Sequence, residues 1–468
     1  MRFHTLSVVV AVALLTSCAG PSPETRSPLP PPSKATAPPD YRLLKGFTEA
    51  LWIVQSQYIE GLETRPLVIH ALRGVDRQLK SRGVGVAVTD RAVIVSHRDA
   101  GAAPETLTLP LLPPDPNAPM EDVDVVARAV AFLEGRSGLG LDEVRDALIH
   151  GLMDADPEGS YVDLKRQFEI PGVASPDLAT AGLDITRRAG TLTVIAPVDG
   201  APAFRAGVQP GDRIVKIDGV STTEVSLPDA MRGMRGKPGS KVTLTVMRDG
   251  WTEARDIEIT REPVRVLAVQ SQDLTDGITQ IKVRAFQPQT ARDVLARLEK
   301  GGMKGVILDL RGNAGGALTA AVEVSEIFLD EGRLVAYTES RVKKHDQRFT
   351  TTAKRVYRSI PMVVVVNHGT AAGAEIVAGA LQDWGRAQLI GTRTFGRASI
   401  QTFVPLSDGT ALRLTTSEWF TPKGRSVRGK GLAPDLMVDV AAGETPARDA
   451  QLTAAVAHLK SLIARQSR

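Results

Sequence analysis

Two successive segments with the pattern strand, tight loop, helix constrain this sequence more than any other feature. In the first, an apolar strand at 305–310 and a helix at 318–329 flank a glycine-rich loop. In the second, an apolar strand at 362–366 and a helix at 375–383 flank a loop of small residues. Strands that alternate with helices predict an α/β layer structure with loops at the strand ends. Such loops place backbone amides at helix N-termini, where an anion or an oxyanion can bind.

Composition excludes several classes of protein. The chain has 468 residues, of which 43% are hydrophobic and 24% charged, as expected for a soluble protein of two to four domains. The net charge is only +4 and the basic residues are scattered, so we expect no nucleic-acid partner. A single cysteine excludes an intramolecular disulfide and a cysteine-based zinc site. We expect neither a metal nor a cofactor.

The N-terminus has the form of an export signal. A charged start precedes an apolar stretch at 6–15 that is too short to span a bilayer, and Cys18 ends this signal (residues 1–18) in a sequence that resembles the bacterial lipobox. The segment 19–40 is rich in proline and predicts an extended tether. We therefore expect a lipidated Cys18, and Ala19 implies the outer membrane as destination. Simple cleavage that leaves a soluble periplasmic protein is the alternative.

The next part of the chain, residues 41–170, is predicted to be mainly helical. Apolar spacing indicates a helical hairpin over 41–80 and a second helical pair over 123–153. Alternating valines predict a short β-hairpin at 84–96. Six prolines between residues 104 and 119 are expected to break any regular structure there.

Residues 172–262 have the pattern of a compact β-rich domain. Short apolar strands at 192–195, 213–217 and 241–246 alternate with turns rich in glycine, proline and aspartate. The stretch 206–219 resembles the most recognisable sequence of PDZ domains. That resemblance places the carboxylate-binding loop, the expected peptide-binding site, at Ala181, Gly182, Leu183 and Asp184.

Taken together, the motifs resemble the C-terminal processing (tail-specific) serine proteases. The resemblance runs from about residue 121 to 440 and rests on motifs at 154–161, 309–316, 374–383, 394–396 and 419–426. It implies an α+β multidomain fold with a helical N-terminal region, a β-rich PDZ domain and an α/β layered, crotonase/ClpP-like protease core. The core is expected at 263–440 and a C-terminal helix at 441–468, whereas residues 81–120 look like an insertion.

The residues that carry the family's chemistry are replaced in this sequence. Family members use a Ser nucleophile, a Lys general base twenty-five residues later, and a Gln four residues beyond it. The matching positions here are Ala372, Arg397 and Gln401. An alanine has no nucleophile and a guanidinium cannot be deprotonated at a working pH, so both chemical roles are lost.

Candidates for a rescue are few. Thr370 and His368 lie next to the nucleophile position but need a dyad geometry that a sequence cannot show, and Ser399 is expected to pack. The loop at 309–316 is expected to be structural, so its presence does not prove a working oxyanion hole. The residues concerned in that loop are Asp309, Arg311, Asn313, Gly315 and Gly316.

The sequence therefore predicts a pseudo-protease in the bacterial periplasm, lipid-anchored to the outer membrane. It would bind protein C-terminal peptides through its PDZ domain, or support an active paralogue or a second copy of itself. The alternative is an active serine-type endopeptidase that uses another nucleophile. A third interpretation, a purely structural envelope protein, requires an occluded PDZ groove.

Overall fold

The computed structural model describes residues 44–113, 120–163, 179–188, 190–223, 225, 227–264, 267–352, 357–439 and 449–466. The predicted signal, the tether and Cys18 lie outside these residues, as does the first part of the predicted C-terminal segment. Within the described ranges, no helix is both long and apolar enough to cross a bilayer.

The N-terminal region contains both predicted helical pairs and a three-stranded antiparallel sheet. Its helices are α1 (Lys45–Gln57), α2 (Thr64–Leu79), α3 (Met120–Leu133) and α4 (Leu141–Leu152). Its strands are β1 (Val84–Val88), β2 (Ala92–His97) and β3 (Glu105–Pro110). The expectation that prolines break regular structure throughout 104–119 was wrong, because β3 pairs with β2 from Glu105 to Pro110. The strand tolerates its proline because it lies at the sheet edge and the proline is its last residue.

Helices α2 and α4 cross where each has a glycine. A Cβ added to Gly74 would lie 2.5 Å from the carbonyl oxygen of Ala147, and one added to Gly151 would lie 2.4 Å from that of His70. No side chain fits between the two backbones there. The two glycines therefore allow the backbones of α2 and α4 to approach closely at this crossing.

The PDZ domain is confirmed as a compact β-rich unit with its own apolar core. Its main sheet has the order β12-β11-β8-β7-β6, which leaves β6 at the edge. These strands are β6 (Leu183–Arg188), β7 (Thr191–Pro197), β8 (Arg213–Ile217), β11 (Lys241–Met247) and β12 (Arg255–Thr260). The smaller elements are β5 (Ala179–Thr180), β9 (Val220–Ser221), β10 (Arg235–Gly236), α6 (Pro202–Arg205) and α7 (Leu227–Gly233).

The core domain is layered as the strand and helix alternation predicts. Its main sheet has the order β13-β14-β15-β18-β19-β22, and every neighbouring pair from β14 onward is parallel. The strands are β13 (Val269–Asp273), β14 (Ile278–Val283), β15 (Gly305–Asp309), β18 (Met362–Val366), β19 (Gln388–Gly391) and β22 (Leu436–Met437). The helices are α8 (Thr290–Glu299), α9 (Leu318–Glu326), α10 (Gly373–Asp383) and α11 (Ala450–Gln466).

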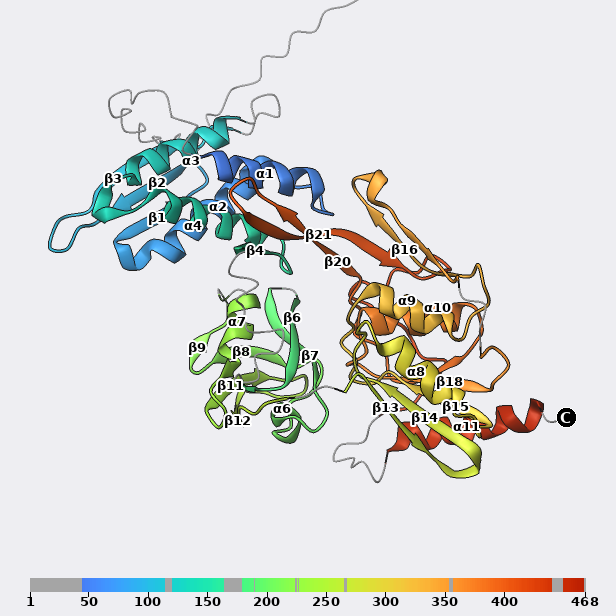
Figure 1. The fold of residues 1–468 in the computed structure, drawn as a ribbon. Coiled ribbons are helices and arrows are strands. Elements are labelled where there is room, and N and C mark those ends of the chain that lie inside the picture. Colours follow the sequence, from blue (N-terminus) through green and yellow to red (C-terminus); the bar gives the residue numbers. More distant parts are fainter. Residues whose placement is uncertain are drawn as a thin grey trace, which may run out of the picture. The chain divides into compact units, whose positions relative to one another are not determined.

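Alternate residues of the buried strands serve two apolar layers. Leu308 and Val364 belong to the cluster that includes α8, α9 and α10, whereas Ile307 and Val363 belong to the cluster that includes α11. The sheet is therefore covered by helices on both faces (Figure 1), which explains why its strands are continuous apolar runs. Helix α10 begins at Gly373, two residues before the predicted start, so Ala372 becomes its N-cap residue.

A second sheet connects the core to the N-terminal region. Strand β21 pairs with β20, β16 and β4, and β16 also pairs with β17. Its members are β4 (Ser160–Asp163), β16 (Leu334–Ser340), β17 (Arg348–Thr350), β20 (Ser399–Pro405) and β21 (Thr410–Phe420). Since β4 and β20 flank β21, the turn before β4 lies near the residues that open β20.

Candidate functional site

Ala372, the predicted nucleophile position, lies in the tight turn between β18 and α10. Its φ of 48° and ψ of −114° form a combination that residues other than glycine rarely adopt. The preceding Ala371 donates its N–H to the carbonyl of Asn313 at 2.9 Å, which fixes the turn against the 309–316 loop. A Cβ on Gly315 would lie 2.8 Å from the methyl carbon of Ala372. The turn thus keeps a strained backbone but presents only a methyl group.

A buried carboxyl group, Glu375, links the two positions that the sequence singled out. It accepts hydrogen bonds from the N–H groups of Ala372 at 3.0 Å and of Arg397 at 2.8 Å. The N–H of Gly396 and the hydroxyl of Thr394 also donate to it. Burial raises the pKa of Glu375 to about 7 and outweighs these hydrogen bonds, which act in the opposite direction. Through this one side chain, the turns that contain residues 372 and 397 are held together.

Arg397, the predicted general-base position, is committed to an ion pair. Its guanidinium lies 3.2 Å from the carboxylate of Glu158, and the two side chains are only 20% and 21% exposed. Its carbonyl accepts the indole N–H of Trp419 at 3.1 Å. A paired guanidinium has no lone pair with which to accept a proton. Arg397 therefore cannot act as the base and instead joins the core to the turn before β4.

Gln401 and Ser399 are bonded to the same glutamate. The Ser399 hydroxyl lies 2.8 Å from each carboxylate oxygen of Glu158, and the Gln401 side-chain N–H₂ donates to the Glu158 carbonyl at 2.6 Å. The side-chain oxygen of Gln401 is buried and finds no partner in the described part of the chain. Gln401, the residue that matches the family at its position, therefore binds the N-terminal region to the core.

Thr370 and His368 do not form a dyad in this structure. The buried hydroxyl of Thr370 donates to the carbonyl of Leu310 at 2.9 Å and accepts the N–H of Asn367 at 3.0 Å. The ring of His368 packs against Phe395, with 5.7 Å between ring centroids. Burial, aided by the charge of Arg188, lowers the pKa of His368. The hydroxyl proton of Thr370 is donated to the residue that follows β15, and its oxygen closes the turn that begins at Asn367.

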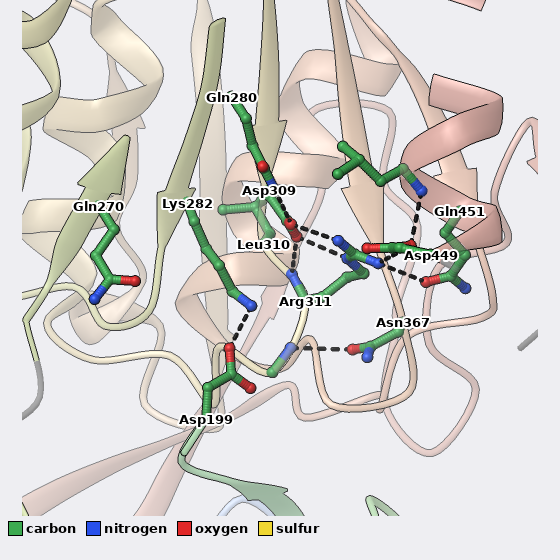
Figure 2. Close-up of polar contacts among 12 residues, drawn as sticks. Asp199, Gln270, Gln280, Lys282, Asp309, Leu310, Arg311, Asn367, Asp449 and Gln451 are labelled. Carbon is green, nitrogen blue, oxygen red and sulfur yellow. Dashed lines mark hydrogen bonds and ion pairs between the residues drawn. The ribbon is translucent and has the colours of Figure 1, made fainter. Parts of the chain in front are cut away.

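The loop that follows β15 is held by a buried ion pair (Figure 2). Asp309 is fully buried and accepts two hydrogen bonds from the Arg311 guanidinium, at 3.0 and 2.7 Å, and one from Gln280 at 2.7 Å. Arg311 also pairs with Asp449, the residue before α11, at 2.8 Å. Burial raises the pKa of Asp309, but the charge and hydrogen bonds of Arg311 outweigh it and hold the pKa below its usual value. This part of the loop attaches α11 to the sheet.

The rest of the loop fixes backbone positions around Ala372. Asn313 donates its side-chain N–H₂ to the Val283 carbonyl at 2.9 Å and accepts the N–H of Gly315 at 2.8 Å. Gly316 has φ 140°, and a Cβ there would lie 2.3 Å from the carbonyl oxygen of Phe286. Every contact that these residues make is therefore consistent with a structural loop.

The predicted peptide-binding loop forms the entrance to β6. Gly182 has φ 73°, and Ala181 donates its N–H to the carbonyl of Met234 at 3.1 Å. Leu183 and Asp184 begin β6, which pairs only with β7 among the described strands. The loop and the outer edge of β6 are thus contiguous, although two loop amides are already bonded within the domain, since the Gly182 N–H also donates to the Thr180 hydroxyl at 3.3 Å.

Sequence reasoning missed two acidic residues of this site. Glu375 stands in the motif at 374–383 and Glu158 in the motif at 154–161, but neither was given a role. The signal for Glu375 was a carboxyl group in a helix that is otherwise apolar over its first turns. Glu158 gave no such signal, because its partners lie more than two hundred residues further along the chain.

Comparisons with known proteins agree with this geometry. The model of peptidase family S41 matches residues 277–438, and that of the PDZ domain matches residues 193–248. The carboxy-terminal-processing protease of Bartonella bacilliformis is 36% identical over 302 residues, which are 63% of this chain and 69% of that protein. Carboxy-terminal processing protease CtpA of Bacillus subtilis is 33% identical over 304 residues, which are 64% of this chain and 65% of that protein.

A solved structure extends the match to the spatial arrangement. The photosystem II D1 C-terminal processing protease superposes with a TM-score of 0.59 at 25% identity, over 81% of this chain and 94% of that one. The sequence motifs, the PDZ domain and the layered core all coincide with those of C-terminal processing proteases. This chain therefore belongs to the C-terminal processing serine protease family, with a PDZ domain and a peptidase family S41 core.

Proposed function

We propose that this protein is a catalytically inactive member of its family that binds protein C-termini through its PDZ domain. One observation carries the proposal: the turn at Ala372 keeps a strained backbone around a methyl group, while Arg397 is paired with Glu158. A Ser–Lys mechanism needs a hydroxyl and a neutral amine, and neither group is present at residues 372 and 397. The fold of the protease core is therefore kept, whereas the Ser and Lys side chains that react in this mechanism are absent.

Peptide binding is supported by the edge of the PDZ sheet. An extended tail can add to the unpaired side of β6 as a further antiparallel strand, while its carboxylate meets the loop that contains Gly182. Since the Ala181 N–H is bonded to Met234, the strand edge has to contribute most of the affinity. We expect tails with a free, apolar C-terminus to bind, and an inactive protein of this kind to present them to a partner such as an active paralogue.

One contact favours a second candidate, an active serine endopeptidase. Ser399 lies 2.8 Å from the carboxylate of Glu158, so a hydroxyl and an acceptor for its proton are adjacent. The same carboxylate is already committed to an ion pair with Arg397 at 3.2 Å. We therefore rank this candidate second, and Ser399→Ala tests it directly.

The location of the protein is part of the proposal. An export signal that ends at Cys18, followed by a proline-rich segment, supports a lipoprotein held at the outer membrane by a proline-rich tether. Binding of tails would then take place in the periplasm. Mass spectrometry of the mature N-terminus tests the lipid, and membrane fractionation tests the location.

The deciding experiment separates cleavage from binding. The exported chain is incubated with an unstructured substrate that ends in apolar residues, and in parallel its affinity for labelled tail peptides is measured by fluorescence anisotropy. We expect no cleavage, and strong weakening of binding when the terminal carboxylate is amidated. Cleavage that disappears in Ser399→Ala would establish the endopeptidase, and equal affinity for free and amidated peptides would reject this mode of binding.

A further inference from the structure

A cavity of about 220 Å³ lies beside the Arg397–Glu158 pair. Its walls come from three parts of the chain: the N-terminal region, the end of β6 in the PDZ domain, and the segment of the core around Arg397. The end of β6 contributes three consecutive residues, Thr186, Arg187 and Arg188. The cavity therefore adjoins the strand edge at which a tail is proposed to bind.

Arginines outnumber acidic residues in the lining of this cavity, by four to two, the acidic residues being Asp156 and Glu158. Four arginines line it, and two of them are neutralised: Arg397 pairs with Glu158 at 3.2 Å, and Arg428 pairs with Glu60 at 2.7 Å. The other two, Arg187 and Arg188, have no carboxylate partner among the residues that the structure describes. Two partly buried guanidinium groups thus remain without a counter-ion, which favours the binding of an anion.

The contacts of these two arginines orient them without neutralising them. The Arg188 guanidinium donates to the carbonyls of Phe395 at 3.4 Å and Gly429 at 2.8 Å. The Arg187 guanidinium donates to the carbonyls of Gly190 and Val225. Carbonyl oxygens satisfy some of the five N–H donors of each group but supply no negative charge. Both groups therefore stay available for a carboxylate.

Two further polar groups line the cavity, and they differ in whether their hydrogen bonds are already made within the described structure. The hydroxyl of Thr186 is buried in a side chain that is 2% exposed, and it has no hydrogen-bond partner in the described structure. The carboxyl of Asp156, by contrast, accepts the N–H and the hydroxyl of Thr415 at 2.6 and 3.0 Å. An unpartnered buried hydroxyl is costly unless a ligand completes its hydrogen bond. It indicates a third donor for the same anion.

The register of β6 says which part of a bound tail reaches the cavity. If the terminal residue of an antiparallel tail lies opposite Leu183, the residue four positions upstream lies opposite Arg187 and the fifth lies opposite Arg188. We propose that the cavity accepts an acidic side chain, Asp or Glu, placed four or five positions before the C-terminal residue of the bound tail. This inference rests on the proposed binding of C-termini and adds to it the chemistry by which tails are selected.

The test uses the exported chain and ten-residue labelled peptides with three apolar residues at the C-terminus. One peptide carries Glu at the fifth upstream position, a second carries Gln there, and a third carries the Glu three positions further upstream. We expect the first to bind about tenfold more tightly than the other two, as for a charge-assisted hydrogen bond. Equal affinities would overturn the inference, whereas an effect of amidation in the same peptides would still support binding of C-termini.

Two variants locate the effect in the cavity. Arg188→Gln should bring the affinity for the Glu peptide down to that for the Gln peptide and leave the latter unchanged. Thr186→Val should weaken the Glu peptide severalfold without lowering the melting temperature, because the hydroxyl has no partner in the free protein. The matched control is Arg213→Gln, an arginine of β8 that is paired with Asp249 at 3.1 Å and lies outside the cavity lining.

The outcomes are distinct. If Arg188→Gln weakens both peptides equally, its role is only to hold the PDZ domain, and the inference fails. If Arg213→Gln abolishes the preference for Glu as well, the effect is one of total charge, and the inference fails again. Stabilisation of the free protein by succinate or phosphate without any preference between the Glu and Gln peptides would show a small-anion site and would overturn the assignment to a tail.

Discussion

Replacement of Glu375 by glutamine tests how the two turns that contain Ala372 and Arg397 are held together. Burial raises the pKa of Glu375 from 4.5 to about 7, so between these values the folded protein binds more protons than the unfolded chain. The free energy of unfolding must then fall as the pH rises. For this one carboxyl group, the linkage relation gives a loss of roughly 2 to 3 kcal/mol between pH 5 and pH 8. Glutamine does not titrate, so Glu375→Gln should lack this loss.

The measurement is urea unfolding at pH 5 and pH 8, followed by the fluorescence of the four tryptophans, one of which, Trp419, donates its indole N–H to the carbonyl of Arg397. At pH 5 the variant should be less stable, because its amide group turns donors towards the N–H groups that Glu375 accepts. Between pH 5 and pH 8 the stability of the variant relative to the native chain should rise by roughly 2 to 3 kcal/mol. Glu339→Gln on an exposed position of β16 serves as control. Parallel pH profiles for the native chain and Glu375→Gln would refute the reasoning.

Four other changes have clear expected outcomes. Gly151→Ala should destabilise the N-terminal region by about 3 kcal/mol, seen as a lower urea midpoint, because the new methyl group meets the His70 carbonyl at 2.4 Å; an unchanged midpoint would contradict the close crossing. Ala372→Gly should raise stability by about 1 kcal/mol, because glycine relieves the positive φ, and a loss of stability would show that the turn is unstrained. Ala372→Ser and Arg397→Lys should each fail to restore cleavage in a peptidase assay, and together they are the minimum change that permits it; activity of either single variant would contradict this. Cys18→Ala should release the protein from the membrane fraction, and unchanged fractionation would refute the lipid anchor.

Much of the fold was predictable from local sequence. The strands of the core are uninterrupted apolar runs, as at Met362–Val366, because they are covered on both faces. In the PDZ domain the strands at 192–195, 213–217 and 241–246 were also predicted from the apolar stretches between glycine-rich turns, whereas β6 and β12 were not. The prediction failed at β3, where prolines were taken to exclude a strand. Their effect depends on whether the strand lies at a sheet edge, and only the pairing with β2 decides that.

The absence of a hydroxyl at residue 372 and of a neutral amine at residue 397 was determined by the sequence alone, because no packing can give Ala372 a nucleophilic atom or Arg397 a removable proton. The present roles of these positions were decided by the tertiary structure. Glu158 meets Arg397, Ser399 and Gln401 only because β4 and β20 flank the same strand, and Glu375 joins two turns only because helix α10 buries it. Side-chain chemistry is a property of each residue, whereas the partners of a residue depend on contacts between segments far apart in the chain, and only the folded structure brings these together.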